Sequence, residues 1–143
     1  MTKIKDKEAL LEALEDEGAA ALENADGRLL ADRDFVLEAV TINGLALEYA
    51  DDSLKADRDF VLAAAKRSGF ALKHADETLQ DDREVVLAAV KQDGPAFAYA
   101  GDSLKADREV VLEAVKNYGE ALEYASDSLK ADREFVLKTL RIH

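Results

Sequence analysis

Among the residues in this sequence that could take part in chemistry, the pair Asp-Arg recurs most regularly. It occurs at Asp32-Arg33, Asp57-Arg58, Asp82-Arg83, Asp107-Arg108 and Asp132-Arg133, always with a step of 25 residues. A guanidinium binds carboxylates and phosphates through two parallel hydrogen bonds, so a row of arginines could hold an anionic ligand. A regularly repeated pair also suits a structural role, as a helix cap and a salt bridge between units. We favour that role and expect the arginines to bind loop acids such as Asp52, Asp102 and Asp127.

Other titratable residues give little indication of catalysis or metal binding. Loop acids such as Asp51 and Asp52 lack the ligand spacing of a calcium-binding EF-hand loop. His74 stands where other units have tyrosine, and we expect it to be a half-buried substitute for that tyrosine. The chain has no cysteine and no serine in a nucleophile-elbow motif. The sequence therefore predicts a protein that is not an enzyme, with no catalytic residue, no metal site and no cofactor.

These residues belong to a tandem repeat, because glycine is a second marker with the same step. It occurs at Gly44, Gly69, Gly94 and Gly119. Both markers give units 6–31, 32–56, 57–81, 82–106 and 107–131, with 132–143 as a final half-unit, and we treat 1–143 as a single repeat domain. In the first unit Gly18 comes 26 residues before Gly44, while the later apolar residues keep the 25-residue step. We therefore place one extra residue between Gly18 and the second apolar segment.

Each unit begins with a segment that has the pattern of an α-helix. In residues 107–118, acids open the segment, a lysine closes it and glycine follows, so we expect that glycine to be the left-handed residue ending the helix. The apolar positions span roughly 200° of a helical wheel, which predicts burial on more than one side. Whether Asp107 and its equivalents cap this helix or lie in its first turn stays open, because either position suits an acid.

The second half of each unit is too short to be stable alone. Residues 121–125 and their counterparts provide about two helical turns, and a leucine such as Leu129 anchors the return to the next unit. Such a segment has to pack on the first helix of its unit. We therefore expect an all-α fold, in which tandem helix-pair repeats of about 25 residues stack as a short α-solenoid.

The repeated pattern resembles a known family. Residues 107–129 read Asp-Arg-Glu-Val-Val-Leu-x-Ala-Val-Lys-x-x-Gly-x-Ala-Leu-x-Tyr-Ala-x-x-Ser-Leu, which is similar to the repeat of the domain of unknown function 4116 family. The resemblance covers nearly the whole chain from Asp6 onward. It implies short all-α tandem repeats and supplies no catalytic residue.

Composition restricts the partners of the chain. Nineteen basic and thirty-one acidic side chains give a formal net charge of −12, and no basic run offers the footprint that direct nucleic-acid binding requires. Acids interrupt the apolar N-terminal stretch, so we expect neither a signal peptide nor a membrane anchor. We expect a cytoplasmic protein, or one in the cytosol of a host cell if the chain is a fragment of an effector.

Positions that vary between units are better candidates for binding than positions that recur. The residues beside the glycines vary most, and we expect them to form one ridge along the stack. The candidate partner-binding residues on this ridge are Ile42, Leu45, Phe70 and Tyr118. Phe70 also has a packing explanation, because a residue after a left-handed glycine normally contacts the residue five positions earlier, here the small Ala65.

Together these features predict a non-enzymatic protein-interaction or scaffold module that offers an acidic surface to a basic protein. One alternative is an acidic nucleic-acid mimic, in which Glu109, Glu113, Glu134 and their neighbours imitate phosphates and occupy a DNA- or RNA-binding protein. A second alternative is an unrecognised hydrolase, which would need a pocket with a carboxylate of raised pKa.

The final half-unit predicts a contact with another chain. Its apolar side has no following segment to cover it, and we therefore expect a homodimer through the C-terminal helix. The apolar residues of this segment are Phe135, Val136, Leu137, Leu140 and Ile142.

Overall fold

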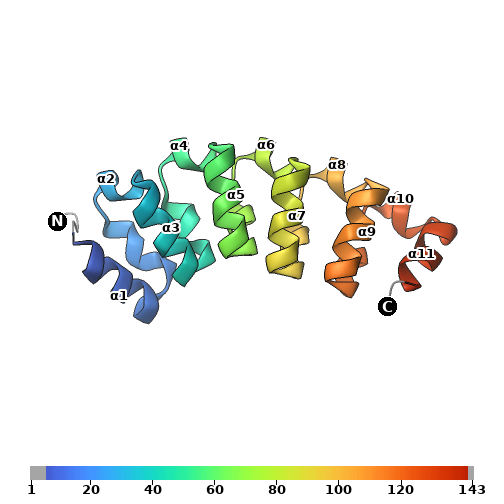
Figure 1. Cartoon of the computed structure of the whole chain (residues 1–143), viewed down its shortest axis with the longest axis horizontal. Helices are drawn as coiled ribbons and strands as arrows, with labels where there is room; N and C mark the ends of the chain where they lie inside the picture. The colour runs from blue at the N-terminus through green and yellow to red at the C-terminus, as the bar shows by residue number, and fades with distance from the viewer. Residues whose placement is uncertain (1–5, 142–143) are drawn as a thin grey trace.

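The chain folds as an elongated, gently curved stack of helices with its two ends far apart (Figure 1). A computed structural model describes residues 6–141. Within that range the regular elements are α-helices and 3₁₀ helices, and there is no strand. The all-α repeat fold expected from the sequence is therefore confirmed.

Each unit begins with its longest helix. These helices are α1 (Lys7–Glu17), α3 (Arg33–Ile42), α5 (Arg58–Arg67), α7 (Arg83–Gln92), α9 (Arg108–Asn117) and α11 (Arg133–Leu140). The aspartate before each helix accepts a hydrogen bond from a backbone N–H three residues further on, as Asp82 does from Val85 at 3.2 Å. The recurrent aspartates are therefore N-caps, which answers the question that the sequence left open.

Two shorter elements complete each unit. A 3₁₀ helix comes first, and the five are η1 (Ala19–Asn24), η2 (Gly44–Tyr49), η3 (Gly69–His74), η4 (Gly94–Tyr99) and η5 (Gly119–Tyr124). A single α-helical turn then leads to the next long helix, and the five are α2 (Gly27–Leu30), α4 (Asp52–Lys55), α6 (Glu77–Gln80), α8 (Asp102–Lys105) and α10 (Asp127–Lys130). The expected second helical segment is thus a 3₁₀ helix, and the expected return loop is one turn of α-helix.

The expectation that glycine ends each long helix in the left-handed conformation is wrong for the repeated glycines. Among residues 6–141 only Gly18 has a positive φ, at 84°. Gly44, Gly69 and Gly94 are instead needed for space, since a Cβ on Gly69 would lie 2.2 Å from the carbonyl oxygen of Ala89 in the next unit. Glycine therefore lets successive units approach closely. The packing contact expected of Phe70 with Ala65 loses its basis, because it assumed the left-handed glycine.

The extra residue of the first unit also lies elsewhere than expected. Helix α1 has 11 residues and α3 has 10, whereas η1 and η2 have the same length and begin 25 residues apart. The additional residue therefore lengthens α1 instead of following Gly18. Gly18 takes the C-cap position that Asn43 holds in the second unit.

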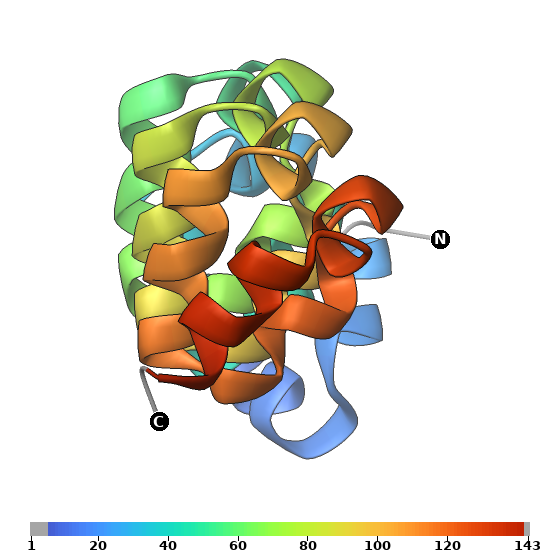
Figure 2. The same ribbon diagram turned by 90° about the vertical axis from the view of Figure 1, so that its right-hand side faces the viewer.

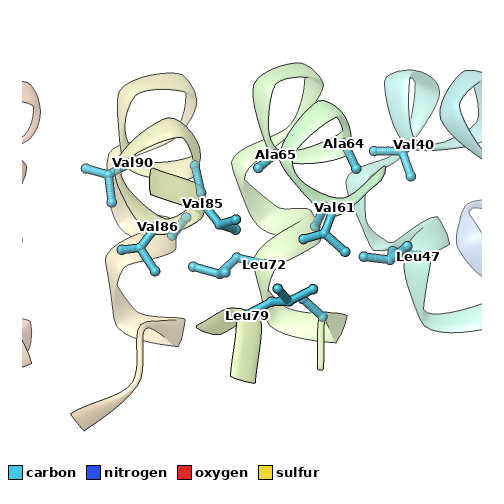
Figure 3. Packing of buried hydrophobic residues seen from close by; sticks show 14 of the residues in the cluster. Val40, Leu47, Val61, Ala64, Ala65, Leu72, Leu79, Val85, Val86 and Val90 are labelled. Atoms are coloured by element: carbon cyan, nitrogen blue, oxygen red, sulfur yellow. The ribbon is translucent and has the colours of Figure 1, made fainter. Parts of the chain in front are cut away.

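The core runs without interruption between the long helices and the 3₁₀ helices. In the third unit, Val61 and Ala65 of α5 and Leu72 of η3 are fully buried, and Leu79 of α6 is nearly so. Figure 3 shows these side chains beside those of the neighbouring units. The wide apolar stripe predicted for residues 107–118 is confirmed, because its members contact both their own unit and the neighbouring long helices.

The repeat gives the molecule two different edges. The long helices all run in the same direction, with the short helices α4, α6, α8 and α10 along their N-terminal ends (Figure 1). We call this side the upper edge and the side with the glycine turns the lower edge. Seen along the stack, the long helices form one layer and the 3₁₀ helices the other (Figure 2). Side chains at equivalent positions of successive units therefore form rows along an edge.

Candidate binding surfaces

The recurrent Asp-Arg pair forms a ladder between units. Arg33 binds Asp57 at 2.6 Å, Arg58 binds Asp82 at 2.6 Å and Glu84 at 2.8 Å, and Arg83 binds Glu109 at 2.8 Å. Lys7 with Asp32 and Arg108 with Asp132 continue it at the two ends. The expected inter-unit salt bridge is confirmed. The expected loop partners Asp52, Asp102 and Asp127 are wrong for the arginines, because each pair of the ladder joins an arginine or lysine to the N-cap aspartate or the first-turn glutamate of the next long helix.

The charged groups of the ladder bind one another. The hydrogen bond from Arg58 holds the pKa of Asp82 below its ordinary value, assisted by the backbone N–H of Val85. The N–H of Phe60 and then Arg33 lower the pKa of Asp57 in the same way. Arg33 also lies over the ring of Phe60, 5.3 Å from its centroid. These arginines are therefore engaged by neighbouring units, which leaves the ladder a structural role.

The upper edge carries a row of acids. The first residues of its short helices are Asp52, Glu77, Asp102 and Asp127, all exposed. A second acid per unit lies in the first turn of the adjoining long helix, and these are Asp34, Asp59, Glu84, Glu109 and Glu134. Lys55 and Lys130 lie 4.0 Å and 3.6 Å from acids of their own short helices. Acids outnumber bases along this edge, and the repeat holds them at regular intervals.

The ridge beside the glycines divides into two parts. Ile42, Leu45 and Phe70 are 38%, 40% and 36% exposed, and Leu45 and Phe70 are the second residues of η2 and η3, which pack side by side. We call these three residues the apolar patch. Tyr118 lies further along, half-buried against Gly94. Its hydroxyl donates to Glu120 at 2.8 Å, which raises the pKa of Tyr118 to about 12.

A surface hollow lies at the lower edge, in the groove between α5 and α7. Its volume is about 370 Å³, and its lining residues are Lys66, Ala88, Lys91 and Gln92. This site was not predicted from the sequence. A sequence pattern could have indicated it, because bases recur at 66, 91, 116 and 141 while alanine replaces glutamate at 63 and 88.

The family model of domain of unknown function 4116 matches residues 6–55, 57–105 and 107–143. The chain belongs to this family. Each match begins at an N-cap aspartate of a long helix, and the first two matches each span two units. No curated protein and no solved structure matches the chain. For this member of the 4116 family, the geometry described above is therefore the basis for any functional argument.

His74 has the surroundings expected of a substitute for tyrosine in the 4116 repeat. Its side chain is 18% exposed, and Nε2 lies 4.0 Å from a carboxylate oxygen of Glu48. Burial lowers the pKa of His74, while Glu48 acts in the opposite direction. Among residues 6–141 no cluster of three histidine, aspartate or glutamate side chains has metal-binding geometry.

The last long helix of this 4116 array has an open apolar side. Leu137 and Leu140 are 45% and 66% exposed, although the residues equivalent to Leu140 in units two to five are buried. Phe135 does not belong to this open side, because it is 2% exposed and packs under Arg108. Val136 is half-buried, and Ile142 lies outside the described residues. The homodimer stays a prediction that now depends on Leu137 and Leu140.

The acids on which the two alternative functions depend include several that form ion pairs or have a lowered pKa. Arg83 binds Glu109 at 2.8 Å and Lys116 lies 3.3 Å from Glu113, so two of the named phosphate mimics are held in ion pairs. A hydrolytic acid needs a raised pKa, whereas hydrogen bonds lower the pKa of Asp51 and Asp76. None of the helices within residues 6–141 has the length and apolar character needed to span a bilayer.

Proposed function

We propose that this chain is a non-enzymatic scaffold whose upper edge binds a basic surface of a partner protein. The observation that carries the proposal is the row of exposed acids that starts each short helix, at Asp52, Glu77, Asp102 and Asp127. A formal net charge of −12 adds a long-range field of the same sign. Such a field speeds the encounter with a basic partner and selects against acidic ones.

Rigid spacing supports binding along this edge. The Asp-Arg ladder ties each long helix to the next, and the backbone adds a second tie, since the N–H of Asp76 donates to the carbonyl of Lys55 at 3.0 Å. The acids are thus held in place before a partner arrives, which reduces the entropy lost on binding. A partner with lysines or arginines at a matching interval gains several contacts from one rigid surface.

Affinity capture tests the proposal with a matched pair of variants. The test variant combines Asp52→Asn, Glu77→Gln, Asp102→Asn and Asp127→Asn. The control combines Glu12→Gln, Glu15→Gln, Asp16→Asn and Glu17→Gln in α1, so both variants change the formal net charge from −12 to −8. We expect the wild type and the control to capture a basic protein that the test variant loses, with binding that weakens as salt rises.

A partner retained equally by both variants would contradict the proposal. Equal loss from both variants would also contradict it, because binding would then follow net charge instead of the upper edge. Circular dichroism and thermal unfolding of each variant establish that the substitutions leave the fold intact.

A further inference from the structure

The lower edge of the molecule carries a row of basic residues, although the chain as a whole is acidic. The row consists of Lys66, Lys91 and Lys116 in the last turn of their long helices, and of Arg141 at the C-cap of α11. A base at this position is favourable in any helix, because it faces the negative end of the helix dipole. Its presence alone therefore does not indicate a ligand.

Two of these lysines differ from the others in their surroundings. In unit five, Glu113 lies three residues before Lys116 and binds it at 3.3 Å. The equivalent residue in units three and four is alanine, at Ala63 and Ala88, and no ion pair with Lys66 or Lys91 is present among the described residues. The two lysines thus border the α5–α7 hollow without a neutralising acid.

The hollow stays open because its neighbours are filled differently. In the groove between α3 and α5, Arg67 reaches across and donates to the hydroxyl of Thr41 at 3.1 Å. The residue equivalent to Arg67 in α7 is the shorter Gln92, which leaves the space of about 370 Å³ beside Ala88. Gln92 can donate to an anion placed between the two lysines.

The apolar patch lies on the same edge. Arg67 directly follows Lys66 and precedes Phe70 by three residues, and Pro95 is the exposed equivalent of Phe70 in unit four. Asp93, the acid at this edge in unit four, is half-buried and accepts a hydrogen bond from the N–H of Gly69 at 2.7 Å. Units two to four therefore combine exposed apolar side chains with uncompensated positive charge.

We propose that the lower edge of units two to four binds an acidic segment of a partner protein. Its carboxylates pair with Lys66 and Lys91 over the hollow, and a bulky apolar side chain packs on Leu45 and Phe70. A nucleic-acid backbone is a poorer match, because its affinity grows with the number of neutralised phosphates and this site offers few cations. The inference does not depend on the upper-edge proposal, since the two surfaces lie on opposite edges and take partners of opposite charge.

Fluorescence anisotropy with a synthetic peptide tests the inference. The probe is a labelled peptide in which glutamate alternates with leucine and phenylalanine. One comparison peptide has serine in place of the apolar residues, and another has lysine in place of glutamate. The protein variants are Lys66→Glu/Lys91→Glu and, as a control with the same change in net charge, Arg28→Glu/Lys130→Glu on the upper edge.

We expect Lys66→Glu/Lys91→Glu to weaken binding of the acidic probe by about tenfold or more, and the control to change it by less than about twofold. The serine peptide should bind about tenfold more weakly than the probe, because it lacks the apolar contact. Phe70→Ser should reproduce that loss with the original probe. The lysine peptide tests the upper-edge proposal separately. That proposal predicts that this peptide loses affinity only for the variant that combines Asp52→Asn, Glu77→Gln, Asp102→Asn and Asp127→Asn.

Equal effects of the two charge-reversal variants would overturn the inference, because they would show binding governed by net charge. The inference would also be overturned if the serine peptide bound with the same affinity as the probe that contains leucine and phenylalanine. Sedimentation of the wild type adds one more outcome. If the protein self-associates and Lys66→Glu/Lys91→Glu abolishes this, the occupant is the acidic edge of a second copy, and the proposal of a separate partner is wrong.

Discussion

At the scale of single residues, the N-cap aspartates explain why one residue type recurs in every unit. Asp82 accepts a hydrogen bond from the N–H of Val85 and a salt bridge from Arg58 of the preceding unit. It thus starts one helix and joins it to its neighbour. The sequence predicted a salt bridge between units, but it left open whether the aspartate caps the helix. It also named the wrong partners for the arginines, because adjacent helices become neighbours only through the stacking of units.

Replacement of Asp82 tests this double role. Asp82→Ala should lower the free energy of unfolding by about 1–2 kcal/mol, mainly because the α7 cap is lost. Arg58→Ala should cost less, since it removes only the surface ion pairs with Asp82 and Glu84. Urea unfolding of the two variants measures the difference. An Arg58→Ala cost equal to or greater than that of Asp82→Ala would show that the salt bridge, and not the cap, is the main contribution.

His74 predicts a pH dependence of stability. Burial lowers its pKa in the folded protein, so the unfolded chain binds the proton more readily. The stabilisation by neutral His74 is therefore present above the unfolded pKa of about 6.5 and is lost as the pH falls through the lower folded pKa. Unfolding measured from about pH 7.5 to 5.5 should show a decline in wild type that His74→Tyr reduces. An identical decline in both proteins would contradict this.

At the scale of the elements, the repeated glycine shows what sequence patterns could and could not predict. Apolar periodicity located the long helices, because the burial of a stripe follows directly from residue spacing. The role of Gly69 was predicted wrongly, since a glycine after a helix suits both a left-handed end and a close contact. The φ of Gly69 and the position of Ala89 in the next unit distinguish the two.

Substitution of this glycine tests the contact. A Cβ on Gly69 would lie 2.2 Å from the Ala89 carbonyl oxygen and 2.9 Å from Cβ of Asp93. Gly69→Ala should therefore destabilise the protein by about 1–3 kcal/mol through overpacking. Gly27→Ala is the matched control, because nothing lies within 4 Å of its added Cβ, and it should be neutral or slightly stabilising. Thermal unfolding that shows equal effects would contradict the contact.

At the scale of the whole molecule, the parallel stacking of the long helices separates the charges. Composition predicted an acidic protein, but it could not show that acids gather on one edge and uncompensated lysines on the other. The hollow between α5 and α7 depends on residues 25 positions apart in sequence, such as Lys66 and Lys91. The apolar patch was predicted as part of a longer ridge, from which the structure separates Tyr118.

The open side of α11 predicts self-association at one end of the stack. Leu140 is 66% exposed where units two to five have a buried residue, and covering it by a second copy would remove apolar surface from water. Sedimentation should show a dimer that forms as concentration rises and that Leu140→Glu abolishes. Lys138→Glu controls for the added charge. A wild-type protein that stays monomeric at high micromolar concentration would contradict the dimer.

The most direct test of the central claim is to map where a basic ligand binds. Backbone amide signals of the labelled protein would be followed by NMR during titration with a peptide rich in lysine and arginine. We expect the signals that move to belong to the upper edge, around Asp52, Glu77, Asp102 and Asp127. Signals that move mainly on the lower edge, or shifts spread evenly over both edges, would contradict it.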